Sequence, residues 1–297
     1  MEPDGRLSAV VLGAGLLGVD LAAKVMRSNS LDLRLVVGRD EATPGLRQAA
    51  RLGLRTAANG IRSLTDTDDV FDVVFDTTNA LSHAEHAERL KPLGTMLVDL
   101  TPSRVGRMVV PVVNGSEALT CRDVNMVSCG GQASIPILHA ITRHHRIDYI
   151  EVVTTAASPS VGRSTRLNID EYVETTQDAI RALTGVKDVK AILNLSPARP
   201  PAMFRVAMSL LGEGLTTESV RPLVMEAARG VRDFAPGYGV TACEVNDGRA
   251  FTAVEVVASG DRVPRYAGNI DIINSAALHV AEQYATGRLS KVGAETS

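Results

Sequence analysis

Short aliphatic runs alternate with amphipathic segments along the first half of the chain. The pattern predicts strands at residues 7–12, 31–37, 70–75, 96–100, 109–114 and 124–127. It predicts intervening helices that end near residue 28 or span residues 45–51 and 81–90. Continuous apolar strands separated by helices are typical of a parallel sheet covered on both faces. We therefore expect an α/β domain with a doubly wound parallel sheet.

The pattern changes in the second half. Ile135, Leu138 and Ile141 mark the apolar stripe of a helix that carries Pro136 in its first turn. Beyond it, strands are predicted at 149–157, 189–195, 204–211 and 252–258, a polar loop at 158–168, and helices at 169–183, 217–233 and 270–284. Strands that follow one another with few helices indicate a mixed or antiparallel sheet. We expect a first domain of residues 1–130 with the helix at 270–297, and a second α+β domain at 131–269.

Composition narrows the function classes. The 297 residues are 45% hydrophobic and 22% charged, with a net charge of −3, so no basic field points to nucleic acid. The sequence lacks the uninterrupted apolar run of about 18 residues that a membrane span needs. Three cysteines form no disulfide framework, and no signal peptide is recognisable, so we expect a cytoplasmic protein.

A dinucleotide-binding fingerprint follows the first predicted strand. Gly13, Gly15 and Gly18 form a G-x-G-x-x-G, in which the glycines permit the tight turn, the approach of a pyrophosphate and close helix packing. Asp40 follows about 20 residues later, where such a unit places the carboxylate that binds the ribose. We predict a Rossmann-type domain that binds NAD. Arg39 beside the acid leaves NADP open, because an arginine there accommodates a 2′-phosphate.

Polar residues also follow the later strands of the predicted sheet, at the edge where open α/β sheets bind ligands. Thr77, Thr78, Thr101 and Pro102 are candidates to line the nicotinamide side. His83 and His86 have H-x-x-H spacing, but they lie among charged residues and no third ligand is evident. We interpret the two histidines as part of a solvated helix face rather than as a metal site.

Cys129 is the candidate nucleophile. It stands between a short apolar strand and a helix, and is followed by Gly130 and Gly131. Free N–H groups and the helix dipole at such a position lower a thiol pKa, and the thiolate is the form that attacks carbonyl carbon. The two glycines allow N–H groups to approach a developing oxyanion. Cys121 and Cys243 lie in no comparable setting and are interpreted as structural.

Several blocks of sequence resemble a known family. They are Asp99-Leu100-Thr101-Pro102, Pro111-Val112-Val113-Asn114, Asn125-Met126-Val127-Ser128-Cys129-Gly130-Gly131-Gln132-Ala133, Asn168-Ile169-Asp170-Glu171 with Glu174-Thr175-Thr176, and Tyr266-Ala267-Gly268-Asn269-Ile270-Asp271. In this order, and over nearly the whole chain, they resemble the acylating acetaldehyde dehydrogenases that partner a 4-hydroxy-2-oxovalerate aldolase. The resemblance implies a second domain of the glyceraldehyde-phosphate-dehydrogenase type.

The resemblance also implies a reaction. A Cys129 thioester would form during NAD-dependent oxidation of a short-chain aldehyde, and coenzyme A, as co-substrate, would accept the acyl group. A homodimer and an aldolase partner are implied as well. Including the fingerprint residues, the expected cofactor contacts are Gly13, Ala14, Gly15, Leu16, Leu17, Gly18, Asp40, Thr78, Ser160, Val161, Gly162, Arg163, Ser164, Thr165, Arg166, Leu167, Asn168 and Asn269.

One residue departs from the family pattern. The family carries an aspartate, thought to act as the base, at the position of Val206, and the segment between Tyr238 and Tyr266 is shorter here. A valine accepts no proton. Another group could serve, such as Asp271, Glu174 or His279; the helix dipole alone could keep Cys129 ionised; or the chemistry could have changed.

Two further functions therefore stay open. One is an oxidoreductase on the same scaffold that has another acyl acceptor or that reduces an imine or ketone without a covalent step. The other is a cofactor-binding relative without catalysis. The sequence leaves the aldehyde chain length and the physiological direction open as well.

Overall fold

The protein is described here by a computed structural model that covers residues 5–260 and 262–295. The chain forms two compact units. The first unit comprises the described residues within 1–126 and from Ala277 onward, and the second comprises those within 127–276. Helix α10, Gly268–Glu295, contributes residues to both units.

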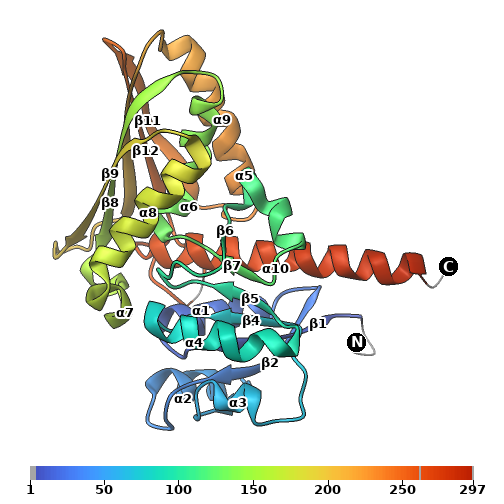
Figure 1. The fold of residues 1–297 in the computed structure, drawn as a ribbon. Helices are drawn as coiled ribbons and strands as arrows, with labels where there is room; N and C mark the ends of the chain where they lie inside the picture. The colour runs from blue at the N-terminus through green and yellow to red at the C-terminus, as the bar shows by residue number, and fades with distance from the viewer. Residues whose placement is uncertain (1–4, 261, 296–297) are drawn as a thin grey trace. The chain divides into compact units, whose positions relative to one another are not determined.

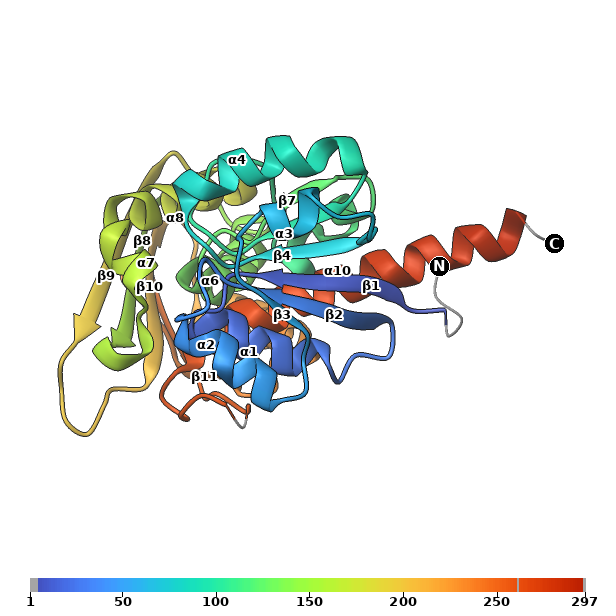
Figure 2. The same ribbon diagram turned by 90° about the horizontal axis from the view of Figure 1, so that it is seen from below.

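The first unit holds a seven-stranded parallel sheet in the order β3-β2-β1-β4-β5-β7-β6. The strands are β1 Leu7–Leu12, β2 Leu31–Val37, β3 Thr56–Ala57, β4 Val73–Asp76, β5 Met96–Asp99, β6 Arg107–Met108 and β7 Asp123–Asn125. The helices are α1 Leu16–Val25, α2 Pro44–Arg51, α3 Arg62–Thr65, α4 Ala80–Leu90 and α5 Pro111–Asn114, with 3₁₀ turns η1 Lys91–Leu93 and η2 Gly115–Leu119. Helices α1 and α2 cover one face and α3 and α4 the other (Figure 2). The predicted doubly wound sheet is confirmed.

The core of this unit follows from its continuous apolar strands. All six residues of β1 are buried, because both faces of the sheet are covered. On one face Val10, Leu35 and Val74 pack with Leu64 and Leu90 from the covering helices. Each large aliphatic side chain removed from water in this way contributes about 1.5–3 kcal/mol before conformational entropy is counted.

The C-terminal part of α10 is tied to the first unit by polar contacts. The Ser28 hydroxyl donates to Glu282 Oε1 at 2.6 Å, and Arg122 Nη1 donates to Tyr284 Oη at 3.1 Å. These contacts join the end of the chain to the segment after α1 and to the start of β7.

The second unit holds a five-stranded mixed sheet in the order β11-β12-β10-β8-β9, in which only the β8–β9 pair is parallel among the described strands. The strands are β8 Ile147–Ala157, β9 Asp188–Ser196, β10 Phe204–Gly212, β11 Tyr238–Asn246 and β12 Arg249–Val256. The helices are α6 Cys129–Thr142, α7 Arg163–Leu167, α8 Ile169–Thr184 and α9 Thr217–Arg232, with the 3₁₀ turn η3 Ser158–Ser160. The predicted α+β unit is confirmed.

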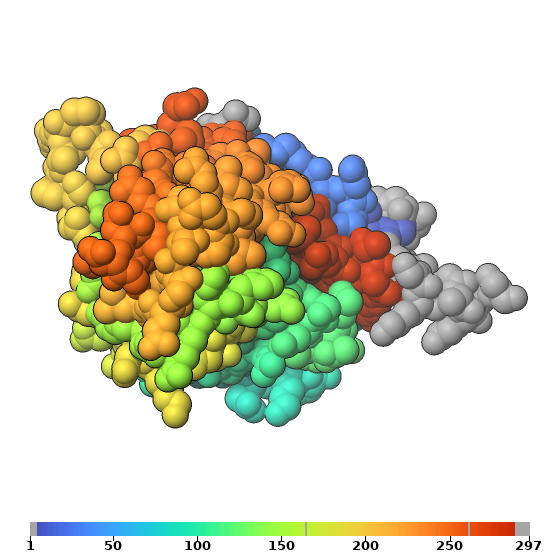
Figure 3. Space-filling model, turned by 90° about the horizontal axis from the view of Figure 1, so that it is seen from above, coloured from blue at the N-terminus to red at the C-terminus, as the bar shows by residue number. Residues whose placement is uncertain are grey.

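Helices α6, α8 and α9 cover one face of this sheet, and the described helices leave the other face open (Figure 1). A sheet covered on one face has buried and exposed side chains in alternation along each strand, and β10 shows this pattern. Val206, Met208 and Leu210 are fully buried. Arg205 and Leu211 are exposed. At one end of the sheet Gly212 packs against the carbonyl of Arg146, and its N–H donates to the Gly248 carbonyl at 3.1 Å. In the surface view, yellow-green segments from the middle of the chain lie beside orange segments from later in the chain (Figure 3).

Several local predictions differ from the structure. Residues 109–114 are not a strand: Pro111 starts α5, and the Asn114 side chain closes the turn by accepting from Val110 N and donating to Met108 O. Pro136 lies inside α6 because the helix already begins at Cys129. The loop at 158–168 contains η3 and α7, and strand β11 was not predicted.

Candidate active site

Cys129 is the first residue of α6, as the sequence predicts. The preceding Ser128 is the N-cap and accepts a hydrogen bond from Gly131 N at 2.9 Å. The Ser128 hydroxyl also lies 2.7 Å from Thr176 Oγ1, which donates to the carbonyl of Tyr172 at 2.6 Å. Because the Thr176 hydroxyl already donates its proton to that carbonyl, the Ser128 hydroxyl must be the donor in its contact with Thr176 Oγ1. The cap of α6 is thereby fixed to α8.

Tyr172 of α8 contacts the sulfur directly. Cys129 Sγ lies 3.4 Å from Tyr172 Oη, and Gly130 N donates to the same oxygen at 3.1 Å. Since that oxygen already accepts from Gly130, its own proton is available to the sulfur. Tyr172 is buried, with 5% of its surface exposed, so its hydroxyl is held in place beside the sulfur.

The electrostatics of the thiol differ from the prediction. Burial raises the pKa of the Cys129 thiol above its ordinary value, and hydrogen bonds from Tyr172 and from the Gly130 N–H offset only part of this. The helix N-terminus therefore does not give a lowered pKa in the free protein. Burial and the neighbouring Cys129 hold the pKa of Tyr172 well above its usual range, so Tyr172 is protonated and acts as a donor.

Packing requires the two glycines after Cys129, and their role at a developing oxyanion stays a prediction. Their N–H groups are already bonded to Tyr172 Oη and to Ser128 Oγ. A Cβ on Gly130 would collide with Thr154 Oγ1 and lie 2.6 Å from Tyr172 Oη, and one on Gly131 would lie 2.7 Å from Val127 Cγ1. Glycine is required so that α8 and β8 can approach the sulfur.

The backbone just before the nucleophile is strained. Val127 has a φ of 63°, in the left-handed region that a β-branched residue rarely enters. Such a residue costs about 1–3 kcal/mol and persists where the surroundings impose it. The strain marks the turn that delivers Cys129 to the start of α6.

Val206 lies close to this cluster. It is fully buried on β10 and pairs directly with Thr154 of β8, whose hydroxyl faces Gly130. The position at which the resemblance expects an aspartate is thus in the same cluster as Cys129, but here it is apolar. Of the alternative bases, Glu174 is exposed and Asp271 is buried within the second unit, whereas His279 belongs to the first unit.

The glycine fingerprint of the first unit has the geometry of a dinucleotide turn. Gly13 has a φ of 117°, and a Cβ there would lie 2.5 Å from Thr77 Oγ1. A Cβ on Gly18 would collide with the Gly13 carbonyl, whereas one on Gly15 would meet nothing within 4 Å. Two glycines therefore allow packing, and the third leaves open space at the start of α1, as an approaching pyrophosphate needs.

The loop after β4 supports this turn. The Thr77 hydroxyl donates to the carbonyls of Leu12 and Gly13 at 3.2 and 2.9 Å. Thr78 donates to Asp76 Oδ1 through its N–H at 3.0 Å and its hydroxyl at 2.6 Å. Asp40 is exposed two residues beyond Gly38 and accepts from the Thr43 hydroxyl at 3.4 Å.

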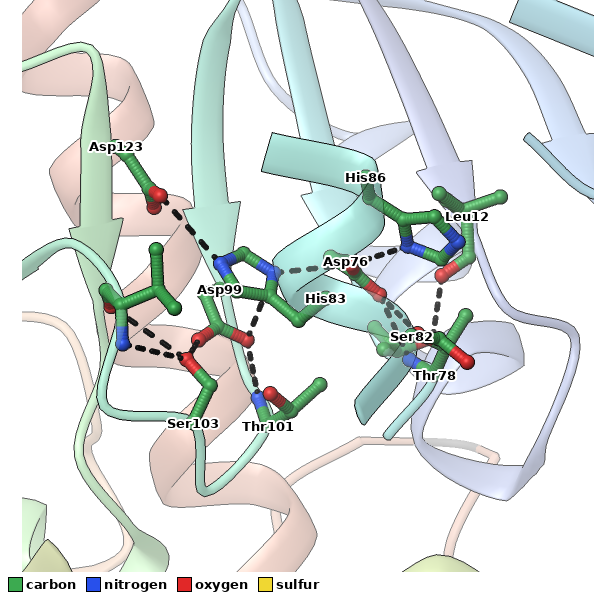
Figure 4. A network of polar contacts seen from close by, with 12 residues as sticks. Leu12, Asp76, Thr78, Ser82, His83, His86, Asp99, Thr101, Ser103 and Asp123 are labelled. Atoms are coloured by element: carbon green, nitrogen blue, oxygen red, sulfur yellow. Dashed lines mark hydrogen bonds and ion pairs between the residues drawn. The ribbon is translucent and has the colours of Figure 1, made fainter. Parts of the chain in front are cut away.

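His83 and His86 are buried, so the prediction of a solvated helix face is wrong. Both histidines contact Asp76 Oδ2 through Nδ1, at 3.0 and 2.7 Å (Figure 4). His83 Nδ1 lies 3.4 Å from Asp99, and its Nε2 lies 3.5 Å from Asp123, which is an ion-pair separation rather than a hydrogen bond. Within the described residues, no group of three or more His, Cys, Asp or Glu is arranged to hold a metal ion.

This His83 network joins the carboxyl ends of β4 and β5. Asp99 accepts from Thr101 N, Ser103 Oγ and Asn125 Nδ2 at 2.7, 2.5 and 2.6 Å. The network thus orders the loops that carry Thr78 and Thr101.

The charges of the network follow from burial and pairing. Burial acts against an imidazolium, but the contacts of His83 with Asp123 and Asp76 outweigh it and raise the pKa of His83 to about 10. Burial likewise opposes ionisation of Asp76, but both histidines lower its pKa to about 2. Burial raises the pKa of Asp99 to about 7, against the charge of His83. His83 is therefore a buried cation near neutral pH.

The remaining predicted cofactor residues lie in the second unit. Asn269 Nδ2 donates to the Ser160 carbonyl at 3.0 Å, so these two residues are in contact. Arg166 donates to the Ser158 hydroxyl at 2.9 Å and to the Val161 carbonyl at 3.1 Å, which folds the loop onto itself. Gly162, Arg163 and Leu167 are exposed, while Thr165 and Asn168 are half-buried. Ser164 lies in α7, but its side chain is outside the described part of the structure.

Known proteins resemble the chain over nearly its whole length. It is 50% identical to an acetaldehyde dehydrogenase of Streptomyces griseus subsp. griseus over 96% of this chain and 93% of the relative. It is 41% identical to one of Geobacillus stearothermophilus over 96% of this chain and 98% of the relative. Residues 129–264 match the family model of the prokaryotic acetaldehyde dehydrogenase dimerisation domain.

The chain belongs to the acetaldehyde dehydrogenase family. Its relatives are oxidoreductases that oxidise an aldehyde, and the same activity class applies here. The fold also matches a crystal structure of aspartate semialdehyde dehydrogenase II from Vibrio cholerae, complexed with ASA, with a TM-score of 0.66 and 14% identity over 93% of this chain and 97% of that chain. Among the described residues no helix is long and apolar enough to span a bilayer.

The match to the dimerisation-domain model begins at Cys129 itself, so it includes the cysteine, Tyr172 and Thr154. Sequence reasoning missed Tyr172 and Thr154 as neighbours of the sulfur. Tyr172 is 43 positions from Cys129 in the sequence. The signal that could have found it is the spacing of Tyr172 and Thr176, which places both side chains on one face of α8.

We expect Tyr172→Phe to slow alkylation of Cys129. The change removes the hydroxyl donor while keeping the ring, so the pKa of the thiol rises further. Reaction with iodoacetamide at about pH 8 should fall about tenfold, and its pH profile should move to higher pH. Tyr149→Phe, the same change elsewhere in the second unit, should alter neither measurement. An unshifted profile in Tyr172→Phe would show that the contact carries no charge stabilisation.

Proposed function

We propose that the protein catalyses NAD-dependent oxidation of a short-chain aldehyde, with acetaldehyde as the reference substrate, to acyl-coenzyme A through a thioester on Cys129. The observation that carries the proposal is the contact between Cys129 Sγ and the Tyr172 hydroxyl at the start of α6. Membership of the acetaldehyde dehydrogenase family supports the substrate class.

The first unit fits the nicotinamide cofactor expected of a dehydrogenase. The open space at Gly15 and the start of α1 suits a pyrophosphate, and Thr77 fixes the Gly13 turn from behind. Asp40 is proposed to bind the adenosine ribose, and Thr78 to lie toward the nicotinamide. When bound, the nicotinamide supplies the acceptor for a hydride.

The second unit supplies the nucleophile. Cys129 Sγ forms a bond to the aldehyde carbon, and the Tyr172 hydroxyl stabilises the thiolate before attack. After the hydride leaves, the carbon is held as a thioester, which the thiolate of coenzyme A displaces to regenerate Cys129. Because the pKa of Cys129 is raised, the rate is expected to increase with pH through neutrality.

Attack by the thiolate gives the thiohemiacetal as its alkoxide, so the proton that must be removed is the thiol proton of Cys129. Val206 offers no acceptor, and Tyr172 stays protonated because its pKa is raised. Cys129 is only half-buried, so we propose that water takes this proton. The absence of a carboxylate at position 206 is expected to reduce the rate, since a general base typically contributes about 10²–10⁴-fold.

The same two observations, the raised Cys129 pKa and the apolar Val206, favour one alternative. This is an oxidoreductase on the same scaffold that transfers hydride without a covalent step. It predicts no acyl adduct on Cys129.

We also propose a homodimer formed through the open face of the five-stranded sheet. Exposed Leu211 and Phe251 lie on neighbouring strands β10 and β12, within the matched dimerisation domain. An aldolase partner and a cytoplasmic location, the latter consistent with the free cysteines, stay predictions.

The test combines turnover with intact mass spectrometry. Acetaldehyde and NAD with coenzyme A should give continuous NADH formation, and without coenzyme A a single burst with one acetyl group added to Cys129. Addition of coenzyme A should then remove the adduct. Sustained NADH formation without coenzyme A and without an adduct would contradict the acylating mechanism and favour the non-covalent alternative.

A further inference from the structure

A cavity of about 780 Å³ opens at the carboxyl end of β2 in the first unit. This volume falls within the range of small-molecule sites, about 300–1,000 Å³. Its wall includes Arg39 from the segment after β2, Arg62 and Ser63 from α3, and Glu85 and Arg89 from α4. Three separate elements therefore bring arginines to one hollow.

Two of these arginines are free to bind an anion. Arg89 pairs with Glu85 at 2.8 Å, but no described residue pairs with the guanidinium of Arg39 or Arg62. The Ser63 hydroxyl is buried in the cavity wall and lacks a hydrogen-bond partner among the described residues. A buried hydroxyl without a partner costs free energy, so a ligand that bonds it would be favoured.

The cavity lies where a dinucleotide fold holds the adenosine ribose. That ribose binds at the end of the second strand, and Arg39 stands two residues after β2. Gly60 N donates to the Gly38 carbonyl at 2.9 Å, which ties the α3 segment to the same strand end. Arg39 lines the cavity, whereas the neighbouring Asp40, the acid expected at the ribose 2′-hydroxyl, is not among the lining residues.

We propose that Arg39, Arg62 and Ser63 form a binding site for the 2′-phosphate of NADP, so that the protein accepts NADP as well as NAD. The proposal rests on the dinucleotide site of the proposed function. Two guanidinium groups and a hydroxyl match the acceptor oxygens of a phosphate, and guanidinium–phosphate hydrogen bonds are charge-assisted. Glu85 is already compensated by Arg89, which leaves Asp66 as the uncompensated acid in the wall.

Binding of nucleotide fragments to the full chain tests the site without catalysis. Calorimetric titration with 2′,5′-ADP and with 5′-AMP isolates the contribution of the 2′-phosphate. We expect 2′,5′-ADP to bind at least about tenfold more tightly, with the advantage falling as salt is raised.

Variants assign the effect to the arginines. Arg39→Ala and Arg62→Ala should each reduce the advantage of 2′,5′-ADP about tenfold. Arg47→Ala is the matched control, because Arg47 is exposed on α2 and does not line the cavity. It should leave the ratio of the two affinities at the wild-type value.

Three results would overturn the proposal: equal binding of 2′,5′-ADP and 5′-AMP, an unchanged ratio in both arginine variants, or an advantage that appears for 3′,5′-ADP instead. None of these results bears on whether Cys129 forms a thioester. Conversely, a chain that turns over no aldehyde can still show the 2′-phosphate preference, so failure of the two proposals is distinguishable.

Discussion

Cys129→Ala is expected to abolish NADH formation from acetaldehyde and coenzyme A, with a loss of about 10⁴-fold or more. The sulfur is the atom to which the proposed thioester is bonded, and no neighbouring side chain can replace it. Tyr172, the side chain that contacts it, is kept protonated by its raised pKa and is no substitute nucleophile. Initial rates of NADH absorbance at saturating substrate give the measurement.

The control for this loss is Cys121→Ala, which removes a thiol from the first unit, where Cys121 is half-buried. It should retain wild-type turnover. Cys129→Ala should keep its affinity for NADH, since the glycine turn belongs to the other unit. Turnover of Cys129→Ala within tenfold of the wild type would rule out a thioester and support hydride transfer without a covalent step.

The fold was largely predictable because buried strands appear in the sequence as continuous aliphatic runs. Continuous aliphatic runs gave β1 and β2 with their correct bounds, and the glycine fingerprint placed α1 directly after β1. The failures have local causes. Val109 to Asn114 is as apolar as a strand, but Pro111 and the Asn114 side chain favour a helical turn.

The site was predictable only where it is local in sequence. The position of Cys129 at the start of α6 follows from the strand–glycine–helix pattern. The contact with Tyr172, by contrast, depends on the docking of α8, and burial reverses the pKa shift that the helix terminus alone predicts. Sequence reasoning counted the favourable helix end but could not count the loss of water around the sulfur.

The histidines of α4 show the same limitation in another form. The sequence pattern predicts that the two histidines face solvent, yet His83 is fully buried, whereas Leu81 of the same helix is 85% exposed. His83, His86 and Leu90 share the buried stripe of the helix. The histidines are tolerated there because the ends of β4 and β5 present carboxylates, a pairing that only the assembled sheet creates.

His83→Gln is expected to lower the free energy of unfolding by about 3 kcal/mol near pH 6.5, because it removes a buried cation and leaves Asp76 and Asp123 partly uncompensated. The pKa of His83 is raised from 6.5 to about 10 in the folded protein. Its stabilisation is therefore complete below pH 6.5 and is lost as the pH rises toward 10. The difference between wild type and variant should thus narrow steadily over this range, as urea unfolding at several pH values would measure.

His144→Gln is the matched control, since His144 is exposed near the end of α6. It should change the free energy of unfolding by less than about 0.5 kcal/mol at every pH. A difference for His83→Gln that stays constant from pH 6.5 to 10 would mean that His83 is neutral and stabilises the sheet through packing alone. A narrowing difference would identify the charge itself as what holds the ends of β4 and β5 together, since packing against α4 does not change with pH.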